Sequence, residues 1–397
     1  MLERNLLVLI TCQCISVSAT VLVVTIGGIV GLSLSPDPAL ATLPMSLMIV
    51  GTAAATVPAA MIMRRFGRRI GFSTAALAAA VAALLGAAAL WLHSFALFCV
   101  FTLLIGAHTA YTQQYRFAAA ESVEPLRSGR AISLVLVGSI GGALVGPELA
   151  TRVADWAVGP EYLGSLLAVS VLFLCSGMLL ALCLEEPQRH IGPSDNTDRR
   201  PLGVVVRQPL FLVAVLGGVV GQGVMTFVMT ATPISMHVMD GFSMAETAGV
   251  IRTHVLAMYV PSLLSAALIG WLGVPRLMAL GLIAFAVTLG VALNGHALMH
   301  YWWALLLLGV GWNFLFVGGT SLLVQCYLPA ERFTAQAIND FSVFGVAALG
   351  SLLAGSVIHV AGWHGVLWGS MPPLVLMAIA LGWLLMRGRR AALASGG

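Results

Sequence analysis

Apolar stretches follow one another along almost the whole chain and are separated by short polar connectors. A helix of about 20 apolar residues is long enough to cross the hydrocarbon core of a bilayer. The pattern therefore predicts an all-α membrane protein with twelve transmembrane helices. The expected spans cover roughly residues 5–32, 39–62, 70–92, 94–118, 129–153, 162–184, 209–236, 244–270, 275–296, 300–327, 333–360 and 363–386.

Composition agrees with this pattern. Hydrophobic residues make up 59% of the chain and charged residues only 9%, whereas a soluble domain carries about 25% charged residues. No nucleophile–base arrangement or cofactor motif interrupts the apolar stretches. We therefore expect a carrier in the lipid bilayer and not an enzyme, with no permanently bound cofactor.

Arginine supplies every basic side chain, because the chain has no lysine. Apart from Arg152 and Arg252, the arginines lie at the two termini and in five connectors. These connectors are residues 62–70, 116–130, 185–208, 270–276 and 327–333. Positive charge gathers on the cytoplasmic side of membrane proteins. The bias predicts a multi-pass protein of the bacterial cytoplasmic (inner) membrane with both termini in the cytoplasm, and it gives no sign of nucleic-acid binding.

The longest hydrophilic segment divides the spans into two sets of six. We expect an N-terminal six-helix bundle over residues 1–184, a cytoplasmic linker over 185–208 and a C-terminal six-helix bundle over 209–397. Two such halves are typical of carriers that rock around a central binding site near the middle of the bilayer.

The connector after the second span resembles the loop signature of the major facilitator superfamily, Gly-x-x-x-Asp-Arg-x-Gly-Arg-Arg. The matching residues are Arg65, Gly67, Arg68 and Arg69. Ala60 replaces the usual glycine and Arg64 the usual aspartate. In the fifth span, the segment from Gly142 to Pro147 resembles the glycine–proline motif that this superfamily often carries in antiporters, although small residues there also permit close helix packing.

Two motifs in the seventh and eighth spans place soft metal ligands on helix faces. Met225 and Met229 are four residues apart, and so are His254 and Met258, so each pair shares one face of a helix. If the segment folds back after Gly241 as an antiparallel hairpin, Met229 lies level with His254. Three thioethers and one imidazole at matched depth suit Cu(I).

The plain alternative is packing, since methionine fills irregular gaps between helices and the chain has 17 methionines. A histidine inside a membrane is costly to bury and usually faces a cavity or a partner. Met236, His237 and Met239 follow on the outer side and would act as ligands along the uptake path.

Together the two motifs are similar to those of the CcoA-like copper importers within the superfamily. The resemblance implies a monomeric secondary transporter that imports copper, free or as a chelate, by alternating access. It also implies a cytoplasmic copper acceptor and a supply of copper for cytochrome c oxidase assembly. The same wider group includes transporters proposed to import riboflavin, so the resemblance leaves the substrate open.

Two further sites come from polar residues inside spans. His108 in the fourth span is a candidate second metal or proton site, with an interhelical hydrogen bond as the alternative. Arg252 in the eighth span needs a partner, and Glu148 and Glu246 are the candidates; a pair with Glu148 would act as an outer gate between the halves. The alternative for Arg252 is a side chain that reaches back to the membrane surface.

Two other transport functions compete with copper import. An importer of a small organic molecule such as riboflavin would use aromatic side chains to stack on a planar ring; the candidates are Tyr111, Tyr115, Phe227 and Trp312. A proton-coupled drug exporter would fit the glycine–proline motif. The scarcity of membrane carboxylates and the altered loop signature argue mildly against the exporter.

Overall fold

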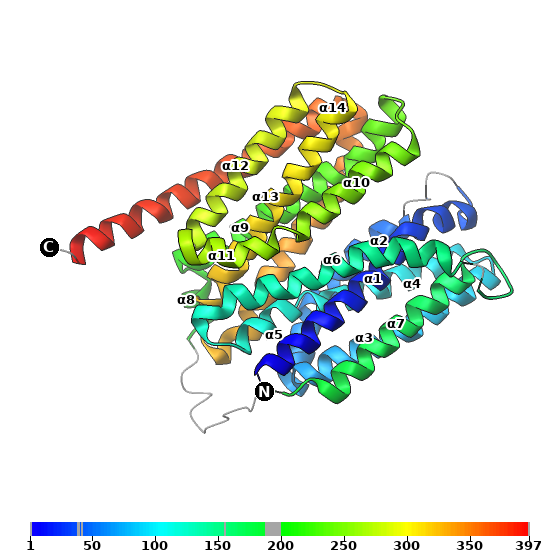
Figure 1. Ribbon diagram of the computed structural model, residues 1–397, viewed down its shortest axis with the longest axis horizontal. Coiled ribbons are helices and arrows are strands. Elements are labelled where there is room, and N and C mark those ends of the chain that lie inside the picture. The colour runs from blue at the N-terminus through cyan, green and yellow to red at the C-terminus, as the bar shows by residue number, and fades with distance from the viewer. Residues whose placement is uncertain (1, 38–39, 41–42, 155, 187–199, 396–397) are drawn as a thin grey trace. The chain divides into compact units, whose positions relative to one another are not determined.

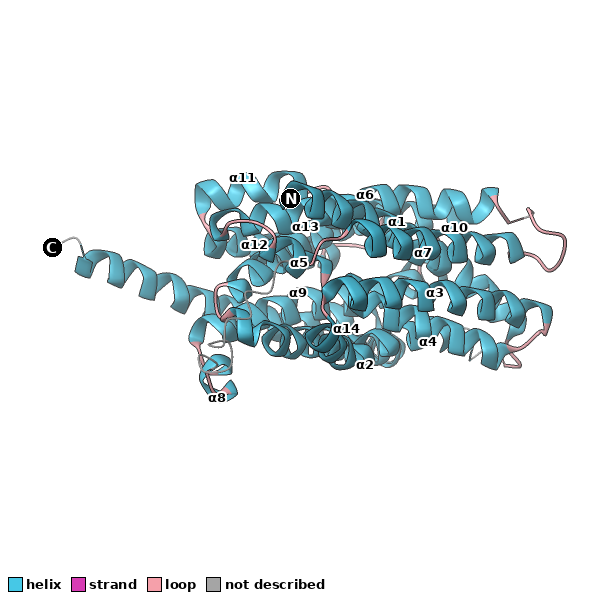
Figure 2. Ribbon diagram, turned by 90° about the horizontal axis from the view of Figure 1, so that it is seen from below, coloured by secondary structure: helices cyan, strands magenta, loops and turns pink. Residues whose placement is uncertain are grey.

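The computed structural model describes residues 2–37, 40, 43–154, 156–186 and 200–395. In these ranges every regular element is a helix, and Figure 2 shows the helices joined by loops. The chain divides into two compact units. The first comprises Met1–Asp195 with the short segment Gln336–Phe341, and the second comprises Asn196–Ala335 with Ser342–Gly397.

The first unit is a bundle of long helices, drawn from blue to green in Figure 1. Its elements are α1 (Leu2–Leu34), α2 (Leu43–Phe66), α3 (Arg68–Trp91), α4 (Phe95–Thr112), α5 (Tyr115–Glu121), the 3₁₀ turn η2 (Pro125–Arg127), α6 (Ser128–Arg152) and α7 (Leu163–Cys183). The main packing pairs are α1 with α6, α2 with α4, and α3 with α7.

Small residues decide how closely α6 approaches α1. A Cβ atom at Gly142 would lie 2.6 Å from Cβ of Val17, and one at Gly146 would lie 2.8 Å from the backbone oxygen of Ser18. Both distances are shorter than side-chain atoms tolerate, so only glycine permits this approach. The packing interpretation of the glycine–proline motif therefore has a direct structural basis.

The second unit is organised around α13 (Leu298–Val324), which packs against three other helices: α9 (Pro209–Pro233), α10 (Met244–Tyr259) and α12 (Val274–Leu293). Its remaining elements are α8 (Leu202–Val206), the π-helical turn η3 (Ile234–Met239), α11 (Ser262–Leu272), the 3₁₀ turn η4 (Pro329–Glu331) and α14 (Arg332–Ser395), of which residues 336–341 group with the first unit.

Eleven helical segments of the described chain are long and apolar enough to cross a membrane. The last of them, Pro329–Arg387, is long enough for two crossings, and its backbone leaves the helical conformation at Gly362, where φ is +65°. Such a φ suits glycine, which lacks a Cβ atom. This break falls between the two predicted spans 333–360 and 363–386. The expected all-helical membrane fold with about twelve crossings is confirmed.

The eighth predicted span is divided in a way that the pattern did not indicate. It forms α10 and α11, which are separated at Val260 and Pro261. Proline lacks the backbone N–H that would continue the hydrogen bonding of α10. The missing N–H would have bonded to the carbonyl of Ala257, and beside this break the amide of Asn313 donates to the backbone oxygen of Met258 at 2.7 Å.

Candidate functional site

Aromatic and amide side chains meet between α9 and α13 in the second unit. The indole Nε1 of Trp312 donates to Oε1 of Gln222 at 2.7 Å, and Nε2 of Gln222 donates to Thr226 at 3.3 Å. Trp312 also stacks on Phe316, with ring centroids 4.7 Å apart and an interplanar angle of 18°. The edge of Tyr259 from α10 contacts Trp312 at a centroid distance of 5.9 Å.

Exposure differs between the members of this aromatic–amide cluster, which we define as Gln222, Tyr259, Trp312 and Phe316. Trp312 and Phe316 are buried, whereas Gln222 and Tyr259 are only partly buried. The buried rings fix the position of the cluster, and Gln222 and Tyr259 are the members with exposed surface. Contact with a solute would therefore involve Gln222 and Tyr259, because the rings of Trp312 and Phe316 already pack on each other.

The other aromatic candidates lie elsewhere. Phe227 lines an apolar cavity of about 260 Å³ between α9 and α14. Tyr115 is buried in the first unit, where its ring meets Phe72 edge to face at 4.7 Å. Tyr111 is partly buried on α4. Tyr115 and Trp312 are both buried and packed against another ring, so stacking of either ring on a solute stays a prediction.

The four predicted copper ligands occupy two helices that both pack on α13. On α9, Met225 is buried and Met229 is partly buried, while on α10 His254 is buried and Met258 is partly buried. Packing of both helices against α13 is extensive, and direct packing between α9 and α10 is marginal. The alignment of the two motifs as the facing sides of one hairpin therefore stays a prediction.

One ring nitrogen of His254 is hydrogen-bonded to the backbone. Its Nδ1 lies 2.8 Å from the backbone oxygen of Leu305, which can only accept, so Nδ1 carries the proton. Nε2 is then the nitrogen with the lone pair, and it is buried with no hydrogen-bond partner. In the described residues, no three side chains among histidine, cysteine, aspartate and glutamate are grouped so as to hold a metal ion.

The predicted uptake-path ligands differ in accessibility. Met236 is fully buried in η3, whereas His237 and Met239 are exposed. Nδ1 of His237 bonds to the backbone oxygen of Phe242 at 2.7 Å. The three residues therefore do not form a continuous row of exposed ligands.

His108 and the predicted gate residues also have defined surroundings. The ring of His108 is buried, meets Phe173 edge to face at 4.5 Å and leaves Nε2 without a hydrogen-bond partner. Glu148 pairs with Arg152 one turn further along α6 at 2.6 Å. Arg252 is exposed on α10, so the Glu148–Arg252 gate stays a prediction.

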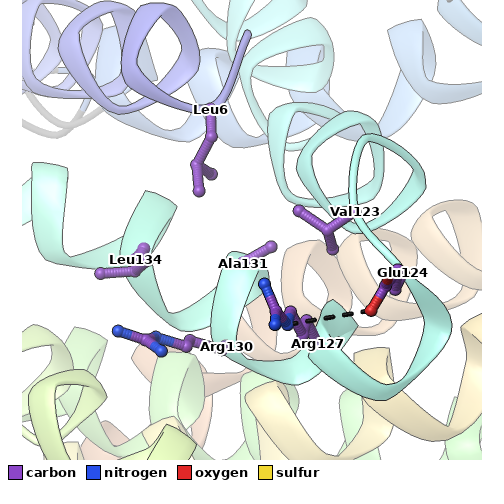
Figure 3. Close-up of a pocket in the computed structure, with 7 residues that line it drawn as sticks. All are labelled: Leu6, Val123, Glu124, Arg127, Arg130, Ala131 and Leu134. Atoms are coloured by element: carbon purple, nitrogen blue, oxygen red, sulfur yellow. Dashed lines mark ion pairs between the residues drawn. The ribbon is translucent and has the colours of Figure 1, made fainter. Parts of the chain in front are cut away.

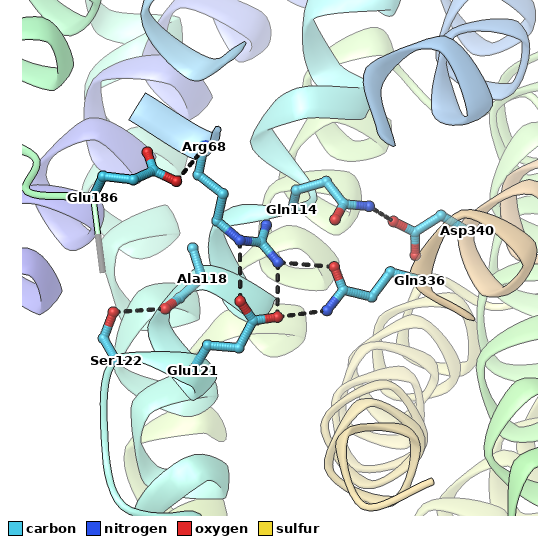
Figure 4. A network of polar contacts seen from close by, with 8 residues as sticks. All are labelled: Arg68, Gln114, Ala118, Glu121, Ser122, Glu186, Gln336 and Asp340. Carbon is cyan, nitrogen blue, oxygen red and sulfur yellow. Dashed lines mark hydrogen bonds and ion pairs between the residues drawn. The ribbon is translucent and has the colours of Figure 1, made fainter. Parts of the chain in front are cut away.

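Figure 4 shows a buried ionic network in the first unit, centred on an arginine of the loop signature. Arg68 forms a two-pronged pair with Glu121, at 3.1 and 2.8 Å, and a further bond to Gln336 at 2.9 Å. Gln336 donates back to Glu121 at 2.8 Å, which closes the ring of contacts. The signature arginine therefore has a structural role in holding α3, α5 and the segment 336–341 together.

Glu186 occupies the N-terminus of α3, beside that network. Its two carboxylate oxygens accept from the backbone N–H groups of Arg68 and Arg69 at 2.9 and 2.8 Å. A negative charge is favourable at this end of a helix, where N–H groups lack partners. The carboxylate thus comes from a residue distant in sequence from the loop signature. Within that signature, Arg64 replaces the usual aspartate.

A second buried pair lies close by; the sequence singled out Asp340 as a gate or a helix-start charge, but its pairing with Arg116 was not predicted. Arg116 donates to Asp340 at 2.6 Å, and both side chains are almost completely shielded from solvent. Gln114 and Asn339 also donate to Asp340, at 2.6 and 2.9 Å. The sequence did carry a signal for this pair. Aspartate and arginine are rare within apolar spans, and where they occur they are normally paired and important.

Comparison with known proteins agrees with the all-helical membrane fold. The model of the Major Facilitator Superfamily matches residues 7–254, and the chain belongs to this superfamily. It is therefore a multi-pass membrane transporter protein by class.

Particular relatives add detail. The riboflavin transporter RfnT of Brucella anthropi is 41% identical over 380 residues, covering 96% of this chain and 95% of that protein. The uncharacterized MFS-type transporter YdeG of Bacillus subtilis is 27% identical and covers 84% of this chain and 81% of its own length. Riboflavin, and not copper, is the substrate in the name of RfnT, so the resemblance to copper importers gains no support.

Two solved structures share the fold. The fucose:proton symporter FucP of E. coli has a TM-score of 0.76 at 17% identity, covering 96% of this chain and 98% of that one. The human organic anion transporter MFSD10 has a TM-score of 0.78 at 16% identity, covering 96% and 99%. At such low identity the likeness concerns the fold alone.

Proposed function

We propose that this protein is a secondary transporter that imports riboflavin or a similar planar, aromatic solute with polar edges. One observation carries the proposal: the 41% identity with the riboflavin transporter RfnT extends over nearly the full length of both chains. This is the alternative that the aromatic residues of the sequence had left open beside copper.

The aromatic–amide cluster supports the proposal on chemical grounds. Riboflavin has a flat ring system with amide-like groups along one edge. A ring contact with a partly buried side chain such as Tyr259 contributes about 0.5–1.5 kcal/mol beyond the burial of area. The amide of Gln222 can both donate and accept, which matches the mixed donors and acceptors of the solute.

Copper import remains as a rival proposal with weaker support. It depends on the spacing of Met225, Met229, His254 and Met258, and on a resemblance to copper importers. The bond of His254 to Leu305 leaves the Nε2 lone pair free for a ligand, whereas the separate packing of α9 and α10 on α13 reduces the support for a joint site. Under this rival proposal, copper is the transported substrate and a cytoplasmic protein accepts it.

Charge supports a placement in the membrane. The arginine-rich connectors and termini favour the cytoplasmic face of the bacterial inner membrane. In an importer with this orientation, the solute enters from the opposite side and leaves toward the arginine-rich face.

Growth of a bacterium that can neither make nor import riboflavin tests the proposal. Expression of this chain should restore growth on low external riboflavin, and Trp312→Leu should abolish the rescue. Trp271→Leu is the matched control, because Trp271 on α11 is 80% exposed and lies outside the cluster. Absence of rescue by the wild-type chain at normal membrane levels, together with chain-dependent copper accumulation, would favour the rival.

A further inference from the structure

A cavity of about 300 Å³ opens at one end of the first unit. Figure 3 shows Arg127 and Arg130 on one side of it, with Leu134 near Arg130 and Leu6 across from the two arginines. Val123, Glu124 and Ala131 complete its lining. The cavity thus combines positive charge with an apolar wall. It has no role in the proposed transport of the solute.

The arginines of this arginine cavity are only weakly engaged. Arg127 lies 3.9 Å from Glu124, and both side chains are 74% exposed, so their attraction is largely screened by water. Arg130 is exposed, and no carboxylate of the described residues lies within ion-pair distance of it. Two arginines against one glutamate leave a net positive charge.

The elements around the cavity place it at the surface of a bilayer. Three candidate spans begin or end here: Arg4–Leu34 and Ser128–Ala150 begin, and Phe95–Glu121 ends. The ends of membrane helices lie at the level of the lipid headgroups. A basic cavity between helix ends at that level is a typical site for a phosphate headgroup.

We propose that the arginine cavity binds the phosphodiester headgroup of an anionic phospholipid. Guanidinium groups match phosphate oxygens in geometry and are less strongly hydrated than ammonium groups. The volume lies at the lower end of small-molecule sites, which suits a headgroup. Leu6 and Leu134 then contact the first carbons of the acyl chains. The lipid is favoured over a free anion because this wall is apolar.

The test uses the full chain in nanodiscs that contain phosphatidylcholine and phosphatidylglycerol in equal amounts. Lipids that remain bound after transfer to detergent are identified by native mass spectrometry. We expect retained phosphatidylglycerol to fall about tenfold in the double variant Arg127→Gln/Arg130→Gln. Arg207→Gln should behave like wild type, because Arg207 is also an exposed arginine but lies in another connector.

A measurement on the unaltered chain accompanies the variants, so that a folding defect does not decide the result. A phosphatidylglycerol with a photoreactive group near its glycerol backbone should label the starts of α1 and α6. Labelling spread evenly over the helices, or equal lipid retention by wild type and the double variant, would overturn the proposal. Displacement of the lipid by millimolar inorganic phosphate would assign the cavity to a soluble anion and overturn the lipid source.

Discussion

Trp312 and Gln222 are joined by a hydrogen bond of 2.7 Å from the indole Nε1 to the amide Oε1, which links α13 to α9 inside the second unit. Each residue of this pair also has a second contact, Trp312 with Phe316 and Gln222 with Thr226. The bond therefore positions both an aromatic ring and an amide. If solute binds here, its affinity depends on this geometry.

Replacement of Gln222 by leucine should weaken solute binding. The change leaves the indole N–H of Trp312 without its partner and costs about 1–3 kcal/mol if no water replaces the amide. We expect the apparent KM of riboflavin uptake to rise about tenfold, because the edge of the solute loses a donor and an acceptor.

The matched control for that prediction is Gln325→Leu. Gln325 is an exposed glutamine at the end of α13, where it bonds to the backbone oxygen of Ser321. Its replacement should leave KM unchanged. Equal KM values for both variants and wild type would show that Gln222 does not contact the solute.

Replacement of Asp340 by asparagine should strongly destabilise the first unit. The buried guanidinium of Arg116 would lose its counter-charge, and breaking a buried pair in this way costs about 3–5 kcal/mol. Thermal unfolding of the purified protein should show a clear fall in Tm. The double variant Asp340→Asn/Arg116→Gln removes both charges and should recover part of the loss.

Glu124→Gln provides the comparison for this ion-pair prediction, since it removes an exposed acid 3.9 Å from Arg127 and should leave Tm almost unchanged. A Tm of Asp340→Asn equal to that of Glu124→Gln would contradict the assigned role of the buried pair.

Substitution of Gly142 by alanine should push α6 away from α1. The added Cβ would lie 2.6 Å from that of Val17, and overpacking of this kind costs about 1–3 kcal/mol. Gly290→Ala in α12 is the matched change, because no atom lies within 4 Å of its added Cβ, and alanine favours a helix by about 1 kcal/mol over glycine. Circular dichroism during heating should give a lower Tm for Gly142→Ala and an equal or higher one for Gly290→Ala; the reverse order would refute close packing at Gly142.

The thiol of Cys326 should resist alkylation at neutral pH. Burial raises the pKa of Cys326 to about 12, and only the thiolate reacts. In a chain that retains Cys326 alone, maleimide labelling should become appreciable only in strongly alkaline solution. A chain that retains only Cys183, a partly buried residue at the end of α7, is the comparison. Rapid labelling of Cys326 at neutral pH would contradict its burial.

Contacts between residues far apart in the chain could not be predicted from sequence patterns, whereas the helices could. Hydropathy located the helices because bilayer thickness fixes their length, and even the break near Gly362 fell between two predicted spans. By contrast, the partners of Arg68 are Glu121 and Gln336, the latter 268 positions away in the chain. No local periodicity carries information about such a contact.

The predicted metal site shows a second limit of prediction from sequence, which is the orientation of a helix relative to its neighbours. Spacing correctly implied that His254 and Met258 share one helix, but the orientation of that helix depends on its neighbours. α10 packs on α13, and the imidazole of His254 bonds to a backbone oxygen of Leu305 there. Packing against a third helix therefore decides which side chains meet, and a motif on two helices does not encode it.

Uptake by proteoliposomes that contain only this protein tests the central claim most directly. Radiolabelled riboflavin and radiolabelled copper are offered in parallel to vesicles with wild type, Trp312→Leu, Met229→Leu or no protein. The account predicts riboflavin accumulation with wild type and Met229→Leu, its loss with Trp312→Leu, and copper uptake no higher than in empty vesicles. Copper accumulation that depends on Met229, with riboflavin at the level of empty vesicles, would contradict it.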